Sequence, residues 1–274
     1  MNKEVCKRFK NVWEDFPDTL NNGDYQFNID RHFKTYCTNN NCEMPLEKIN
    51  AACLYLFDGF FKDADLFKSV AKSNIDIVEY IMIWLSYMVN LKNNEPNLTN
   101  QQHFYTAYIK SGNKYNNTIN HVSGYNSYKK LIDKNNYFLS MDKSIIFKFY
   151  DAFKSLCNLY NELDDNQNCK KYLDDDNDFF KKYEELKKDS SITGNNSYIK
   201  ILYTLSDDYD NLKNKCNNSP SLLTNSLISI AFIFGAIALF LGISYKYSLF
   251  GFRKRFQKQK LREKIKNIKK KMNH

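Results

Sequence analysis

Hydrophobic residues recur at helical spacing along most of the first 216 positions. In the stretch 46–61, four of them share one helical face: Ile49, Cys53, Leu56 and Phe60. The stretch 73–91 carries a broader apolar face, and Ser73 with Asp76 three residues later resembles a capping box at its start. We therefore expect two core helices over these stretches.

The same period predicts further helices that begin at Thr99 or cover the stretches 145–163, 179–186 and 198–212. Strands are marked by strict alternation of apolar and polar residues, and that alternation is missing from the chain. The pattern therefore predicts an all-α fold.

Polar stretches separate the predicted helices. Residues 1–36 are expected to form short helical pieces, because Pro17 and the run 21–24 interrupt any long helix. Residues 37–45 are typical of a polar loop that two cysteines can tie down. Residues 111–127, rich in Gly, Asn and Tyr, predict a long loop, which is either a recognition loop on a fixed scaffold or a variable, partly mobile insert.

An uncharged apolar run occupies residues 222–245. As a helix these residues span about 36 Å, enough to cross a hydrocarbon layer of about 30 Å with some tilt. Soluble helices of this length usually carry a polar face, which this run lacks. We therefore predict one transmembrane helix over 222–245, preceded by a juxtamembrane linker at 217–221.

The charge balance predicts the orientation of that helix. Residues 246–274 hold 12 basic residues and one acidic residue, whereas the rest of the chain holds 28 basic and 30 acidic residues. Basic flanks stay on the cytosolic side, so residues 1–216 are expected outside as an ectodomain and residues 246–274 inside as a short basic cytoplasmic tail. Because the basic charge adjoins the spanning helix, binding to nucleic acid is not expected. The first residues form no apolar leader, so entry into the secretory route is expected to depend on the 222–245 helix or on a signal of another kind. The competing arrangement is a tail anchor with a cytosolic N-terminus, which would require the basic tail to cross the membrane.

Small side chains at 4-3-4 spacing line one face of the predicted spanning helix: Ala231, Gly235, Ala238 and Gly242. Such a face lets two spanning helices approach closely and favours a homo-oligomer, although Gly and Ala are also ordinary in lipid.

Apolar side chains at the same spacing occur among the lysines of the tail: Leu261, Ile265, Ile268 and Met272. They indicate a basic amphipathic helix that lies on anionic inner-leaflet lipid or holds a cytoskeletal partner. The alternative is a flexible charged tail that only sets the orientation.

All seven cysteines precede the membrane run: Cys6, Cys37, Cys42, Cys53, Cys157, Cys169 and Cys216. Their absence from the tail suits an ectodomain in an oxidising space, and we expect disulfides among them. An odd number leaves one thiol free or intermolecular, and the spacing does not choose among the pairings.

Motifs for catalysis, metals or cofactors are weak or missing. Four carboxylates have the spacing of an EF-hand calcium loop: Asp174, Asp176, Asp178 and Glu185. However, Phe179 occupies the position where that loop requires Gly. The pair Cys37 and Cys42 lacks the second ligand pair of a zinc site. We therefore expect no metal, no cofactor and no enzyme activity.

Four segments resemble one protein family. They are VCKRFKNVWEDFPDTL at 5–20, KINAACLYLFDGFF at 48–61, IVEYIMIWLSYMVNL at 77–91, and the membrane run and tail from 229 to 266. Together these segments are similar to the Plasmodium interspersed repeat (PIR) multigene family, called CIR, YIR or BIR in rodent parasites. The resemblance implies a variant antigen exported to the infected red cell, with a helical, disulfide-bearing ectodomain. It also implies roles in immune evasion and host-cell binding, and it assigns no catalytic residues.

Two functional hypotheses follow. The first is an exported, single-pass, non-catalytic surface antigen whose ectodomain presents variable loops to an unknown host surface molecule. The second is an exported adaptor that remodels the host erythrocyte through its basic amphipathic tail, from the cell membrane or from exported vesicles. Exposure of the ectodomain on intact infected cells distinguishes the two.

Overall fold

The structure, a computed structural model, describes residues 1–29, 31–92, 99–162, 173–174 and 176–218. The chain divides into two compact units, Met1–Ser219 and Pro220–His274, and all the described residues belong to the first unit. The predicted linker, transmembrane helix and tail lie outside the described residues, apart from the backbone of residues 217 and 218. Within the described part, no helix is both long and apolar enough to cross a membrane.

The described part is helical and contains no strand, which confirms the all-α prediction there; its only bridge pairs are isolated, Asn21 with Asp24 and Thr38 with Asn41. The elements in chain order are α1 (Lys3–Asp15), α2 (Arg31–Lys34), α3 (Pro45–Phe61), α4 (Ala64–Ser69), α5 (Ile77–Asn90), α6 (Asn100–Phe104), the π turn η1 (Tyr105–Ile109), the 3-10 turn η2 (Asn113–Asn116), α7 (Tyr128–Lys134), the 3-10 turn η3 (Asn136–Ser140), α8 (Lys143–Glu162), α9 (Asp178–Lys188), α10 (Ser190–Thr193) and α11 (Asn196–Asn218).

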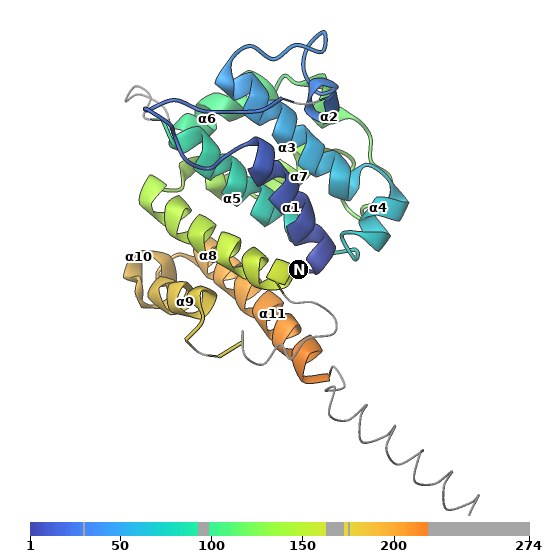
Figure 1. The fold of residues 1–274 in the computed structure, drawn as a ribbon. Helices are drawn as coiled ribbons and strands as arrows, with labels where there is room; N and C mark the ends of the chain where they lie inside the picture. Colours follow the sequence, from blue (N-terminus) through green and yellow to red (C-terminus); the bar gives the residue numbers. More distant parts are fainter. Residues whose placement is uncertain (30, 93–98, 163–172, 175, 219–274) are drawn as a thin grey trace, which may run out of the picture. The chain divides into compact units, whose positions relative to one another are not determined.

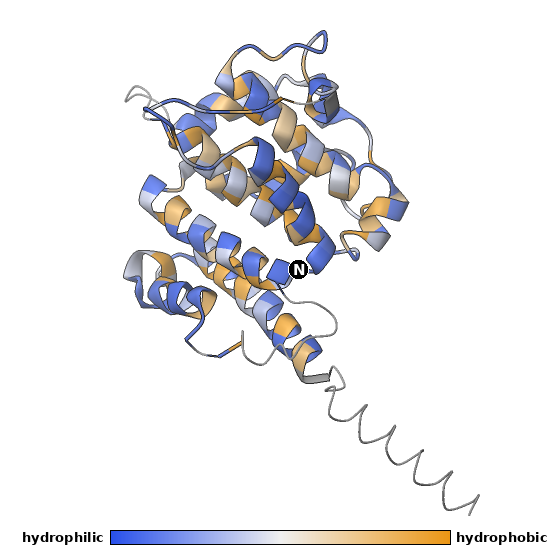
Figure 2. Ribbon diagram, in the orientation of Figure 1, coloured by the Kyte–Doolittle hydropathy of each residue, from blue (hydrophilic) through white to orange (hydrophobic). Residues whose placement is uncertain are grey.

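Helix α5 lies at the centre of the unit. Every residue of α5 except Tyr87 is buried, because its sequence is apolar around nearly the whole helix. It packs against α3 and α8, and α1 lies across both of these helices. Helices α9, α10 and α11 gather on the side of α8 away from α3 (Figure 1). Hydrophobic residues follow α3 and α5, whereas the outward side of α1 is hydrophilic (Figure 2).

The start of α5 differs from the predicted capping box. The helix begins at Ile77, and Ser73 has a positive φ of 57°, which places it in a turn outside the helix. The side chain of Asn74 accepts a hydrogen bond of 2.8 Å from the amide of Asp76 and so fixes the entry of the chain. The capping-box prediction was therefore wrong, although the core helix itself is confirmed.

Other helix predictions are confirmed with shifted ends. Thr99 caps α6 by accepting a hydrogen bond of 3.2 Å from the amide of Gln102. The four residues assigned to one face of α3 are all fully buried: Ile49, Cys53, Leu56 and Phe60. The N-terminal helix α1 is longer than the short pieces expected, because Asn2 caps its start and it ends at Asp15, just before Pro17.

Candidate functional site on the outer loops of helix α3

A tight turn precedes α3. Asn39 and Asn40 have φ values of 52° and 58°, and the amide of Asn41 donates a 3.0 Å hydrogen bond to the carbonyl of Thr38. Asparagine tolerates this left-handed backbone better than most residues, which is why consecutive asparagines suit the turn. A disulfide joins Cys37 and Cys42, the residues on either side of this turn. The predicted polar loop is therefore a rigid hairpin-like turn whose asparagine side chains are exposed.

The second loop, residues 111–127, alternates between exposed amides and buried anchors. Three apolar residues hold it on the helices beneath, each at most 4% exposed: Tyr115, Ile119 and Val122. The hydroxyl of Tyr115 donates a 2.8 Å hydrogen bond to the side chain of Asn50 on α3. Further along, the ring nitrogen Nε2 of His121 lies 3.0 Å from the carbonyl of Phe61. These contacts hold the loop on a fixed scaffold and do not agree with a partly mobile insert, while its role in recognition stays a prediction.

Asp58 of α3 anchors both segments. Its Oδ2 accepts a 2.8 Å hydrogen bond from Tyr36, next to the tight turn, and its Oδ1 accepts a 2.9 Å hydrogen bond from Tyr128, where the second loop ends. Burial raises the pKa of both tyrosines, and the nearby Asp58 carboxylate raises it further. Both phenols therefore stay protonated and remain donors at any physiological pH.

Lys114 joins the two loops. Its ammonium donates a 3.1 Å hydrogen bond to the carbonyl of Thr35 and lies 5.8 Å from the ring centroid of Tyr36. Burial lowers the pKa of Lys114. We call the combined surface of residues 35–45 and 111–127 the outer loop face. Asparagine is the most frequent of its exposed residues, and Met44 is also 62% exposed. Such a surface can form hydrogen bonds to a partner.

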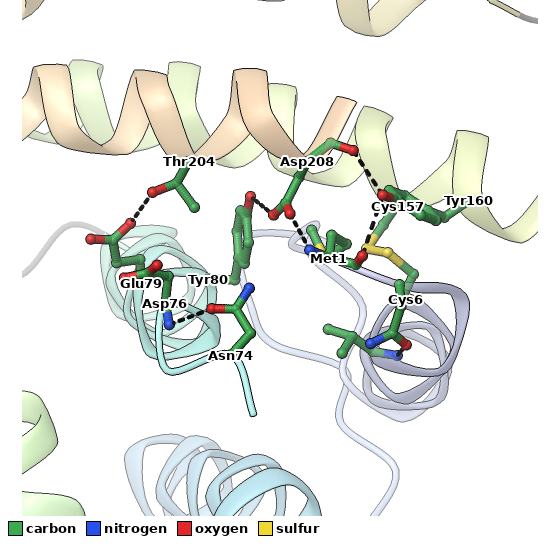
Figure 3. A network of polar contacts seen from close by, with 12 residues as sticks. Met1, Cys6, Asn74, Asp76, Glu79, Tyr80, Cys157, Tyr160, Thr204 and Asp208 are labelled. Atoms are coloured by element: carbon green, nitrogen blue, oxygen red, sulfur yellow. Dashed lines mark hydrogen bonds and ion pairs between the residues drawn. A yellow bond between two sulfur atoms is a disulfide. The ribbon is translucent and has the colours of Figure 1, made fainter. Parts of the chain in front are cut away.

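A buried polar network lies elsewhere, where α1, α5, α8 and α11 meet (Figure 3). Asp208 of α11 pairs with the amino group of Met1 and accepts a 2.7 Å hydrogen bond from Tyr80 of α5. The hydroxyl of Tyr160 donates a 2.7 Å hydrogen bond to the carbonyl of Asp208. The partners come from α5, α8, α11 and the residue two positions before α1, so the network fixes how these helices pack. We call this region the helical seam.

A second buried carboxylate extends the seam. Glu79 of α5 is 1% exposed, and it accepts hydrogen bonds of 2.5 Å from Lys200 and 2.9 Å from Thr204, both on α11. Burying a carboxylate is costly unless it is paired and hydrogen-bonded, and Glu79 is both. The contacts explain its position as structural, and no catalytic role is needed to account for it.

Among the described residues, five cysteines are disulfide-bonded and one is a free thiol. Cys6 of α1 and Cys157 of α8 form a disulfide across the helical seam, and Cys37 and Cys42 form the local one described above. Cys216 is also disulfide-bonded, and Cys169 lies outside the described residues. Cys53 is the thiol left over: it is free and fully buried, and burial raises its pKa to about 12.

The acidic segment before α9 has ordinary structural partners. Asp178 starts α9 and accepts hydrogen bonds from Ser155 and Lys182, while Asp176 pairs with Lys181. Across the described residues, no three His, Cys, Asp or Glu side chains are grouped to hold a metal ion. The remaining candidate faces, on the predicted spanning helix and in the tail, lie outside those residues.

Four anchors of the outer loop face were not predicted from the sequence: Asp58, Tyr36, Tyr128 and Asn50. A polar residue inside an apolar helix, such as Asp58 in α3, was the available signal, but it does not reveal its partners.

Comparisons with known proteins agree on one family. The family model for the Plasmodium variant antigen protein Cir/Yir/Bir matches residues 6–246. A solved structure, described as that of a Plasmodium PIR protein ectodomain, is 35% identical and superimposes with a TM-score of 0.62. The match covers 79% of this chain and 93% of the solved chain. No curated protein matches the chain.

Proposed function

The chain belongs to the Cir/Yir/Bir family of Plasmodium variant antigens, the PIR proteins, and from that premise we propose that it is a non-catalytic surface antigen whose outer loop face binds a host surface molecule. The observation that carries this proposal is the construction of that face. Two exposed, amide-rich loops are attached to α3 by hydrogen bonds from Tyr36, Tyr115 and Tyr128, and a disulfide closes the first loop on itself.

This construction suits a recognition surface that must also vary. Loops that are already ordered lose little conformational entropy on binding, which leaves more of the contact energy for affinity. The exposed amides between the anchors contribute little to the core, so substitutions there cost little stability. Antibody contacts can therefore change while the fold is kept, which is the physical basis of the immune evasion we propose for this protein.

The proposed topology is single-pass, with the first unit outside the membrane and the tail in the cytosol. It rests on the uncharged run 222–245, the excess of basic residues after it, and cysteines that all precede it. The proposed location is the infected erythrocyte surface or exported vesicles, with the tail held on anionic inner-leaflet lipid.

Adhesion of cells that display the full chain tests the outer loop face. The variant pair Asn117→Arg and Asn120→Arg places two bulky charges on exposed positions of the second loop. The matched control pair is Asn211→Arg and Asn214→Arg, at exposed positions of α11. We expect the wild type to bind at least one host cell type, the loop variant to lose that binding, and the control to keep it. Equal binding by all three would contradict the proposed site.

Labelling of intact cells tests the topology separately. Antibodies against the first unit should stain unpermeabilised infected cells, and carbonate washing should leave the protein in the membrane. An ectodomain reached only after permeabilisation would favour the alternative, an adaptor that acts on the host cell through its tail.

A further inference from the structure

Two stretches of the chain that meet at one corner of the first unit carry six basic residues. We call it the α1–α4 corner: Lys7, Arg8 and Lys10 of α1, Lys62 directly after α3, Lys68 of α4, and Lys72 in the turn that follows. Two contacts bring these segments together. The side chain of Asn2, which caps α1, donates a 2.8 Å hydrogen bond to the carbonyl of Val70. One turn further on, the guanidinium of Arg8 lies 6.0 Å from the ring centroid of Phe60 on α3.

The lysines of this corner differ from many others in the unit. Elsewhere, lysines pair with carboxylates within ion-pairing distance: Lys92, Lys129, Lys148, Lys154, Lys181, Lys182, Lys187 and Lys200. In the part of the chain that the structure describes, none of the six corner side chains has such a partner.

Nearby acidic residues do not balance this charge. Residues 4–10 and 62–72 contain the six basic residues and three acidic ones, Glu4, Asp63 and Asp65. The carboxylate of Asp63 accepts a 2.8 Å hydrogen bond from the amide of Leu66 at the start of α4. The chain before residue 246 has slightly more acidic than basic residues, so a basic corner is a local concentration of charge. Such a concentration attracts anionic partners and speeds their encounter.

The shape and chemistry of the corner narrow the class of partner. All of the six except Arg8 are exposed, and they come from two stretches of the chain, 7–10 and 62–72. Ammonium groups are point charges without the planar fork that selects a carboxylate or phosphate in one geometry. The corner therefore fits an extended polyanion better than a compact anion.

A lipid surface fits the corner less well. Peripheral membrane binding combines basic residues with apolar side chains that enter the interface. Among the described residues, the exposed large hydrophobic side chains are Met44 and Tyr203, and neither belongs to the segments of the corner. The corner therefore has the basic residues of a membrane-binding surface, but its described segments have no large exposed hydrophobic side chain to enter the interface.

We propose that the α1–α4 corner binds a sulfated polysaccharide of the glycosaminoglycan type on host cells. The inference rests on the proposed topology, because that partner is outside the cell. It adds a second binding surface, separate in residues and in chemistry from the outer loop face. The charge contacts would bring the protein to the cell surface, while the amide-rich loops select a specific molecule.

Binding of fluorescent heparin to cells that display the full chain tests the proposal. The host cells should lack their own sulfated glycans, so that the displayed chain is the only variable. The test variant is Lys7→Glu, Lys62→Glu and Lys68→Glu. The control, Lys34→Glu, Lys110→Glu and Lys188→Glu, makes the same change of charge at three exposed lysines that are dispersed over the unit and also lack a described ion pair. Surface staining with an antibody to an added epitope corrects for the amount of folded, displayed protein.

We expect the wild type and the control to bind heparin in low salt and to release it as salt rises. The affinity of the test variant for heparin should be lower by a factor of about ten or more. Absence of heparin binding by the wild type, or equal losses in test and control variants, would overturn the proposal. So would binding of phosphatidylserine vesicles, with no binding of heparin, through the same three lysines. A failure of the proposed topology is recognised separately, because the epitope would then not stain without permeabilisation.

Discussion

The helical seam and the outer loop face are each closed by a disulfide, but the two bonds have different consequences. Cys6–Cys157 joins residues 151 positions apart, across the contact between α1 and α8. Cys37–Cys42 joins residues five positions apart, around a single turn. Closing a long loop restricts the unfolded chain far more than closing a short one. The first bond therefore stabilises the fold, whereas the second mainly fixes the shape of an exposed turn.

The polar contacts of the two regions differ in the same way. In the seam, Asp208 and Glu79 are almost fully buried and joined to other helices, so a substitution there leaves a charge or a donor without a partner. On the outer loop face, a few anchors such as Asp58 carry the attachment, and the amides between them point to solvent. The fold thus depends on the residues of the seam, whereas the exposed residues of the proposed recognition surface can vary while the fold is kept.

The largest effect should come from breaking the long-range disulfide. We expect the double variant Cys6→Ala and Cys157→Ala to lower the free energy of unfolding by about 5 kcal/mol, because a loop of about 150 residues is released in the unfolded chain. Denaturant titration of the purified chain measures this. If removal of the Cys37–Cys42 disulfide lowered the free energy of unfolding by the same amount, the two disulfides would not differ in their contribution to stability.

The next effect should come from the buried carboxylate of the seam. Asp208→Asn removes the negative charge that pairs with the Met1 amino group and weakens the hydrogen bond from Tyr80. We expect a loss of about 3 kcal/mol in the free energy of unfolding, since a buried charge loses its partner. The neighbouring exposed Asp207→Asn is the matched control and should change stability by less than about 0.5 kcal/mol. Equal losses in both variants would exclude a specific role for the network.

A smaller effect is expected from the outer disulfide. The double variant Cys37→Ala and Cys42→Ala should lower the free energy of unfolding by about 2 kcal/mol, because only a short loop is released in the unfolded chain. Its adhesion to host cells should fall more than its stability suggests, because the exposed asparagines of the turn are no longer held in place. Thermal unfolding and cell adhesion measured on the same preparation check both parts. Unchanged adhesion would show that the turn does not contribute to binding.

The smallest effect concerns Cys53, which lies on α3 beneath the second loop and interacts with Tyr115. Its thiol keeps its proton in the folded protein up to about pH 12 but releases it above about pH 9 when unfolded, so stability should fall as pH rises through that interval. Between pH 9 and 10 the ionisation of this thiol in the unfolded chain should lower the free energy of unfolding by about 1 kcal/mol. Denaturant titrations of the wild type and of Cys53→Ala at pH 7, 9 and 10 should show the difference narrowing with pH. A constant difference would indicate that the loop opens and admits water to the thiol.

The sequence predicted the helices of the frame well where the hydrophobic period was strong. The stretches that became α3, α5 and α8 were found because burial on one or more faces leaves a regular pattern of apolar residues. The start of α5 was misjudged, because the side chain that orders the turn is Asn74 and not Ser73. The helix α7 and the turn η3 were not anticipated, since segments this short contain too few periods to stand out.

The site was harder to predict than the fold. The polar loop and the long loop were located from composition, but nothing in the spacing showed that Asp58 would hold both. The two described disulfides were likewise among many pairings that the sequence allowed. Pairing depends on which helices pack against each other, and that contact is between residues far apart in the chain.

The sequence by itself determined the fold class, the family resemblance and the charge asymmetry along the chain, because these depend on local composition and on short-range periodicity. Only the tertiary structure decided which cysteines meet, which loops share one surface, and which lysines lack a partner. Those properties arise when segments distant in sequence are brought together by burial of the apolar faces of α3, α5 and α8, and no local pattern records them.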